Sequence, residues 1–147
     1  MTEFARIEAP MSMFSDQELA GLFAATTLWH AHGIEGLSIL VACMARSEAE
    51  RRHWNRQHPH EPPKEAGYGD IRLSDWSDKD VADALVFCWG FADTNNIKLG
   101  ELVDALGETF VTIAGERLRA SHDPRNATGF EERCREREGN RNDPEAN

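Results

Sequence analysis

The chain has 147 residues, of which 40% are hydrophobic and 29% are charged. This is the size and composition of one soluble globular domain, and it is too short for two domains with separate cores. The 26 acidic and 16 basic residues give a net charge of −10, whereas non-specific binding to duplex nucleic acid requires the opposite sign. We therefore expect no duplex nucleic acid among the partners.

Cysteine usage and the apolar runs indicate the compartment. Cys43, Cys88 and Cys134 are an odd number at wide spacing, which argues against a disulfide framework and for a reducing environment. Cys43 and Cys88 lie within apolar helical patterns, so we expect both to be small core residues. Residues 1–14 lack the pattern of a signal peptide, and the longest mostly apolar stretch, Leu37–Ala45, is too short to cross a bilayer. These features predict a cytoplasmic protein without a membrane partner.

The N-terminal third predicts an irregular segment followed by two helices. Residues 1–14 show no clean periodicity. Ser15 and Glu18 have the spacing of a capping box at a helix start, and Gly33 is placed to end that helix. A second helix is predicted from about residue 34 to 55, with an apolar stripe along one side.

The remainder predicts a long loop, two more helices and a tail. Residues 57–74 are rich in Pro and Gly and are expected to form a loop, either a binding lid or an ordinary connector. Ser77 and Asp80 form a second capping box, at the start of a helix that is expected to be buried on more than one side. A fourth helix follows, and no stretch alternates with the period of a strand. We predict an all-α four-helix bundle over residues 15–120, with one long inter-helix loop and a disordered, charged tail over 121–147.

Three carboxylates are candidates for a metal site. Glu48 continues the apolar stripe of the second helix, so its side chain should point into the bundle. Asp80 and Asp83 are three residues apart and share a helix face. Carboxylates that converge in one seam need a counter-charge, and Mg²⁺ with a phosphate substrate is one answer. In the alternative, Asp80 only caps its helix, Asp83 is half-exposed, and Glu48 pairs with Arg51 or Arg52.

Two stretches of the sequence resemble a known family. They are LVACMARSEAERR, which contains Glu48, and DKDVADALVFCWGFADTNNIKLGELVDALGETF, which contains Asp80 and Asp83. They are similar to the Glu-x-x-Glu helix and to the second half of the MazG-like, all-α nucleotide pyrophosphohydrolases. The resemblance implies that these three acids hold Mg²⁺ and that the protein releases pyrophosphate from a nucleoside triphosphate. Ala45 stands where the family has a further acid, which implies reduced activity.

Further residues either support the pyrophosphohydrolase interpretation or point to a different function. Trp54 and Trp76 flank the long loop and are the candidates for stacking on a nucleotide base; no separate catalytic residue is assigned. The alternative function is a non-catalytic helical interaction or inhibitor module, such as mobile elements encode, whose acidic surface engages a basic protein. Apolar residues such as Leu28 and Ile39 are left over in a four-helix monomer, which favours a homodimer.

Overall fold

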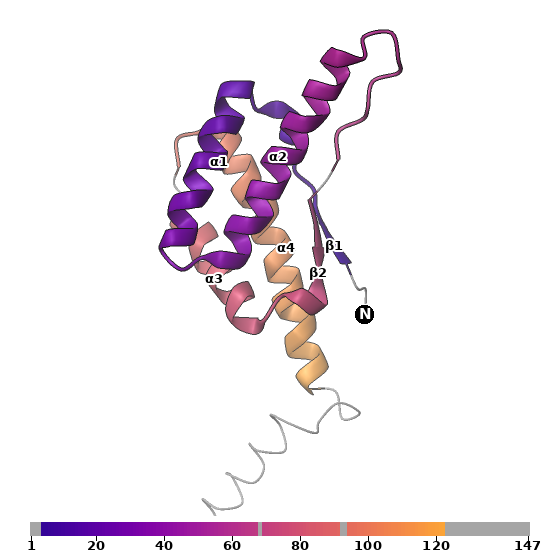
Figure 1. The fold of residues 1–147 in the computed structure, drawn as a ribbon. Coiled ribbons are helices and arrows are strands. Elements are labelled where there is room, and N and C mark those ends of the chain that lie inside the picture. The colour runs from indigo at the N-terminus through magenta and orange to yellow at the C-terminus, as the bar shows by residue number, and fades with distance from the viewer. Residues whose placement is uncertain (1–3, 68, 92–93, 123–147) are drawn as a thin grey trace, which may run out of the picture. The chain divides into compact units, whose positions relative to one another are not determined.

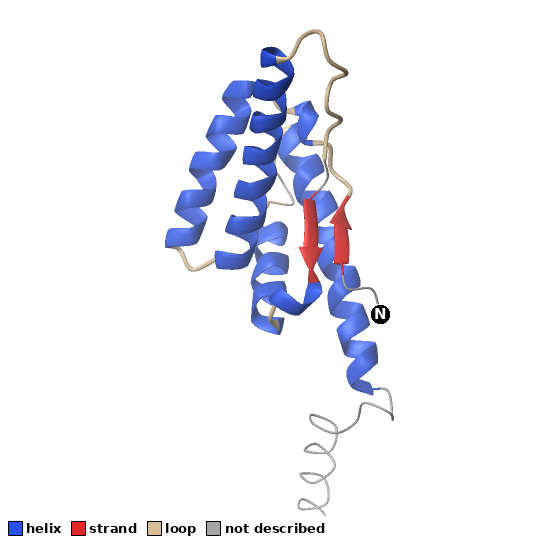
Figure 2. Ribbon diagram, turned by 45° about the vertical axis from the view of Figure 1, so that its right-hand side comes forward, coloured by secondary structure: helices blue, strands red, loops and turns tan. Residues whose placement is uncertain are grey.

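The computed structural model describes residues 4–67, 69–91 and 94–122, and this part is mostly helical with one small antiparallel sheet (Figures 1 and 2). The elements in chain order are β1 (Phe4–Ile7), η1 (Met11–Met13), α1 (Asp16–Ala31), α2 (Glu35–Gln57), β2 (Gly69–Arg72), η2 (Leu73–Asp75), α3 (Asp78–Gly90) and α4 (Ile97–His122), where η denotes a short 3₁₀ helix. The chain divides into a compact unit that ends at Val111 and a second unit from Thr112. Of the second unit only residues 112–122 are described, and they continue α4.

The helix boundaries confirm the sequence predictions, because local hydrogen bonds set them. At the start of α1, the Ser15 hydroxyl accepts the Glu18 N–H at 3.1 Å and the Glu18 carboxylate accepts the Ser15 N–H at 2.9 Å. Ser77 and Asp80 make the same reciprocal pair at the start of α3. Gly33 follows α1 with a φ of 86°, a left-handed conformation that favours glycine and ends the helix.

The sheet was not predicted. β1 pairs with β2 so that Ala5 lies opposite Ile71 and Ile7 lies opposite Gly69. Ile7 and Ile71 are fully buried and join the core. Each strand has only four residues, too few for their alternation to stand out in the sequence, and the partners come from distant parts of the chain. The predictions that residues 1–14 are irregular and that 57–74 is entirely loop are therefore wrong at these two strands.

The core of the first unit is built from the inner sides of the helices and the sheet. Its fully buried large side chains are Phe110, Ile7, Leu37, Ile71, Leu102 and Val41. Trp76 packs against Phe110, with 4.9 Å between the ring centroids. β2 lies so close to α2 that a Cβ added to Gly69 would be 2.5 Å from the sulfur of Met44. A side chain at position 69 would require Met44 to shift, and glycine avoids this.

Two burial predictions are wrong. α3 was expected to be buried on more than one side, but its buried residues, Val81, Ala84 and Cys88, share one side of the helix, and Val86 and Trp89 are 64% and 67% exposed. Cys43 was expected in the core and is exposed, whereas Cys88 is buried as predicted, and burial raises the pKa of its thiol to about 11. Both errors have the same cause: an apolar helix side is recognised from sequence, but the tertiary structure decides whether another element covers it.

Two further predictions concern the tail and the membrane. Most of the predicted tail, including Cys134, lies outside the described residues. Within the described ranges, no helix has both the length and the apolar character needed to cross a bilayer.

Candidate functional site

Glu48 lies buried on α2 beside two arginines. Its side chain is only 3% exposed. Its carboxylate accepts hydrogen bonds from Nε and Nη2 of Arg51, with an Nε–Oε1 distance of 2.7 Å and an Nη2–Oε2 distance of 3.0 Å. Nε of Arg52 lies 3.8 Å from Oε1. An ionised carboxylate that is shielded from water needs a counter-charge. Here Arg51 and Arg52, on the next turn of the same helix, supply that positive charge.

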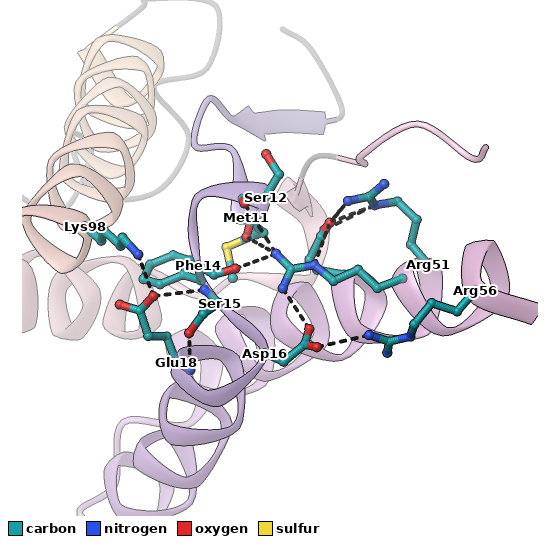
Figure 3. Close-up of polar contacts among 11 residues, drawn as sticks. Met11, Ser12, Phe14, Ser15, Asp16, Glu18, Arg51, Arg56 and Lys98 are labelled. Carbon is teal, nitrogen blue, oxygen red and sulfur yellow. Dashed lines mark hydrogen bonds and ion pairs between the residues drawn. The ribbon is translucent and has the colours of Figure 1, made fainter. Parts of the chain in front are cut away.

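Arg52 holds the N-terminal segment against α2. Its guanidinium donates hydrogen bonds to the carbonyl oxygens of Phe14 at 2.5 Å and Ser12 at 3.4 Å, and to the Asp16 carboxylate at 2.9 Å. Arg56 also bonds Asp16, at 3.0 Å (Figure 3). The hydrogen bond from Arg52, followed by that from Arg56, lowers the pKa of Asp16. The start of α1 is thereby fastened to the C-terminal half of α2.

Arg51 holds a different segment, the α2–β2 connection (residues 58–67). Its Nη1 donates to the Lys64 carbonyl oxygen at 3.1 Å. The Asn55 amide bonds both backbone groups of Lys64, at 2.9 and 3.3 Å. The Lys64 ammonium lies 4.4 Å from the centroid of the Trp54 ring, on which the His58 ring also stacks. Lys64 is therefore the residue that fastens this connection to α2.

A hollow of about 620 Å³ runs along α2 beside this connection and β2. We call it the α2 hollow. Its apolar lining includes Leu40, Met44 and Trp54, and its charged lining includes Glu48, Arg51 and Lys64. Glu48 and Trp54, which the sequence assigned to metal and base binding respectively, are thus brought into one hollow.

The other predicted site residues lie elsewhere. The Asp80 carboxylate accepts the Ser77 N–H at 3.2 Å as a helix cap, and the Asp83 carboxylate lies 2.7 Å from the Lys79 ammonium. Trp76 belongs to the core packing around Phe110 and does not line the α2 hollow.

The three predicted ligands do not share one seam. Across residues 4–67, 69–91 and 94–122, no three His, Cys, Asp or Glu side chains are grouped to hold a metal ion. Glu48, Asp80 and Asp83 each have a partner within their own helix turn, which removes the repulsion that was expected to need a cation. This arrangement does not fit a shared Mg²⁺ site, and the Mg²⁺ assignment stays a prediction from the resemblance.

The exposed side of α3 is the second notable surface. Asp78, Ala82, Val86 and Trp89 are exposed and lie within about 80° of one another around the helix axis. We call these four residues the outer α3 surface. A hollow of about 580 Å³ adjoins it at Val86 and extends to the turn after α1. This surface combines three apolar side chains with the one acidic side chain of Asp78.

The lining of that second hollow is partly aromatic. It includes Phe87 and Phe91, whose ring centroids are 4.7 Å apart, and Trp29 packs against Phe87 at 4.6 Å. Lys79 and Asp83 also line it, and their hydrogen bond raises the pKa of Lys79. The lining of the hollow therefore combines aromatic rings with an ion pair.

Comparison with known proteins found no family model, no curated protein and no solved structure that matches this chain. Sequence reasoning missed Asn55 and Lys64, because their contacts depend on how the connection folds back. The pairing of Glu48 with Arg51 and Arg52 was available as the alternative interpretation, from their spacing of three and four residues along a helix.

Proposed function

We propose that this protein is a non-catalytic interaction module that binds a basic protein segment through the outer α3 surface. The observation that carries the proposal is the exposure of Val86 and Trp89, at 64% and 67%, on one side of a helix. Large exposed apolar side chains that gather on one surface are typical of protein interaction sites, and tryptophan is enriched among the residues that dominate binding energy.

The charge of the partner follows from the residues around this surface. α3 carries three acidic residues, Asp78, Asp80 and Asp83, and one basic residue, Lys79, and Asp78 lies in the same row as Trp89 on this helix. A cationic partner is attracted by such a surface, and an anionic one is repelled. The adjoining hollow has space for a large apolar side chain. The matching partner is an amphipathic segment that carries Lys or Arg beside an apolar anchor.

The geometry supports this proposal over the hydrolase interpretation. Glu48, Asp80 and Asp83 are engaged with Arg51, Ser77 and Lys79 respectively. Recruiting them for a cation would require breaking three separate interactions, including a buried one that is costly to lose.

The test uses a synthetic amphipathic peptide of Leu and Lys, measured by fluorescence anisotropy against the full chain. Trp89→Ala should weaken binding at least tenfold, and a peptide with Glu in place of Lys should not bind. Leu28→Ala is the matched control, because Leu28 is also 64% exposed but lies on α1, and it should leave the affinity unchanged. Equal losses in both variants, or equal binding of the Glu peptide, would overturn the proposal.

Two further measurements bear on the alternatives. Sedimentation should show a monomer; a dimer that Trp89→Ala dissociates would identify a second copy of the chain as the occupant instead. Pyrophosphate release from nucleoside triphosphates with Mg²⁺, abolished in Asp83→Ala, would replace the proposal with the hydrolase function.

A further inference from the structure

We propose that the α2 hollow is a binding site for a linear polyamine, and that the side chain of Lys64 occupies part of this site when no ligand is bound. This inference is independent of the outer α3 surface, since it concerns a different face of the first unit. It rests on an aromatic ring that already holds an ammonium group, on the charges that line the hollow and on its apolar wall.

The ring of Trp54 is already a receptor for an ammonium group. The Lys64 ammonium lies 4.4 Å from the ring centroid, within the range over which a cation is attracted by the face of an indole. A primary ammonium of a ligand has the same charge and size as that of Lys64. It can therefore take the same place when the lysine side chain turns away.

The Lys64 side chain can leave without releasing the connection. Its segment is bound to α2 through backbone groups, by Arg51 and by Asn55. The residues from 59 to 67 are exposed, so the lysine side chain has solvent to move into. Exchange of one ammonium for another then requires only side-chain rotation.

The lining favours cations over anions. Glu48, Glu50, Glu65 and Asp70 line the hollow together with Arg51 and Lys64, and Arg51 neutralises the buried Glu48 carboxylate. Glu50 and Asp70 pair with Arg46 and Arg6 across exposed contacts of 2.9 and 3.5 Å. Exposed pairs of this kind contribute little, so these carboxylates can turn toward a ligand. Departure of Lys64 leaves an excess of negative charge for a second ammonium.

The apolar wall explains why the ligand is a chain and not an isolated ion. Met11, Leu40 and Met44 line the same hollow, and methylene groups between two ammonium centres can lie against them. A polyamine satisfies both demands, because it places positive charges several carbon atoms apart on an apolar chain. A metal ion or a small inorganic cation offers no surface for these side chains.

The test is isothermal titration of the full chain with spermidine at constant ionic strength. Trp54→Leu should weaken binding at least tenfold, because the ring that receives the ammonium is lost. Lys64→Gln should strengthen it several-fold, because the internal competitor is removed while the backbone bonds remain. Lys79→Gln is the matched control: it removes the same charge from α3, and it should bind no more tightly than the parent protein.

Each outcome decides the proposal. Equal strengthening in Lys64→Gln and Lys79→Gln would show that spermidine responds only to net charge, and would overturn it. Absence of binding to both the parent protein and Lys64→Gln would overturn it as well. Circular dichroism checks that Trp54→Leu folds; if it does not, the comparison of the two lysine variants still decides the question.

Discussion

The buried carboxylate of Glu48 accepts hydrogen bonds from Arg51, the residue that holds the α2–β2 connection through the Lys64 carbonyl oxygen. Arg52, on the other side of the same carboxylate, holds the N-terminal segment. One acid on α2 therefore sets the positions of two arginines that fasten two distant segments to the helix. The first prediction follows from this arrangement.

Glu48→Gln should destabilise the fold by about 3 kcal/mol, because it leaves the largely buried Arg51 guanidinium without its counter-charge, whereas Arg52 keeps its contact with Asp16. Urea denaturation followed by circular dichroism measures this. Glu50→Gln is the control: Glu50 pairs with Arg46 in an exposed contact, and its loss should cost no more than about 0.5 kcal/mol. A more stable Glu48→Gln protein would contradict the arrangement, since that result is expected of a carboxylate held among other acids.

The two arginines should protect different segments. Arg51→Lys removes the planar group that spans Glu48 and Lys64, so amide hydrogen exchange should accelerate in residues 58–67. Arg52→Lys should accelerate exchange in residues 11–16 instead, because a single ammonium cannot replace the forked contacts. Exchange measured by mass spectrometry on both variants checks this. If hydrogen exchange became faster in the same set of peptides in both variants, the two arginines would be acting as one unit, which would contradict the prediction.

Gly69→Ala should destabilise the protein by about 1–3 kcal/mol, because the new Cβ would overlap the Met44 side chain at its sulfur and Cγ. Gly67→Ala is the matched control, since nothing lies within 4 Å of a Cβ at that position, and it should change stability by less than about 0.5 kcal/mol. Thermal unfolding of the two variants tests the close approach of β2 to α2. Equal stabilities would contradict the prediction and show that the Met44 side chain moves aside at little cost.

Glu18 should contribute stability that depends on pH. Its hydrogen bond from Lys98, at 2.5 Å, and that from the Ser15 N–H lower its pKa from 4.5 to about 2 (Figure 3). A lowered pKa in the folded state means that the contribution is complete above about pH 5 and is lost as the pH falls toward 2. The stability difference between the parent protein and Glu18→Gln should shrink over that range. Urea denaturation at several pH values measures it, and a constant difference would contradict the prediction.

The two described cysteines should differ in reactivity. In a Cys134→Ser background, iodoacetamide at pH 8 should modify Cys43, which is exposed, and spare Cys88. Cys88 is buried, and burial raises the pKa of its thiol to about 11. The reagent therefore cannot reach the sulfur, and little of the thiol is in the reactive thiolate form at pH 8. Mass spectrometry of the alkylated peptides, with and without urea, checks both statements. Modification of Cys88 in the folded protein at the rate of Cys43 would contradict its burial.

The helices could be predicted because their signals are local. Ser15 with Glu18 and Ser77 with Asp80 each form a cap within three residues, and Gly33 ends a helix through its own backbone conformation. Such interactions need no distant partner, so the residue types and their spacing are sufficient. The burial of Glu48 was predicted for the same reason, from its place on an apolar helix side.

Only the tertiary structure determines which helix sides are covered by another element and which charged residues come into contact. β1 and β2 exist only because two distant four-residue segments pair, and Lys64 reaches Trp54 only because the connection folds back onto α2. The apolar side chains of α3 look the same in sequence whether they are covered or, like Trp89, exposed. Periodicity states which residues share a side of a helix, but the free energy of burial depends on what packs against that side, and only the three-dimensional arrangement contains that information.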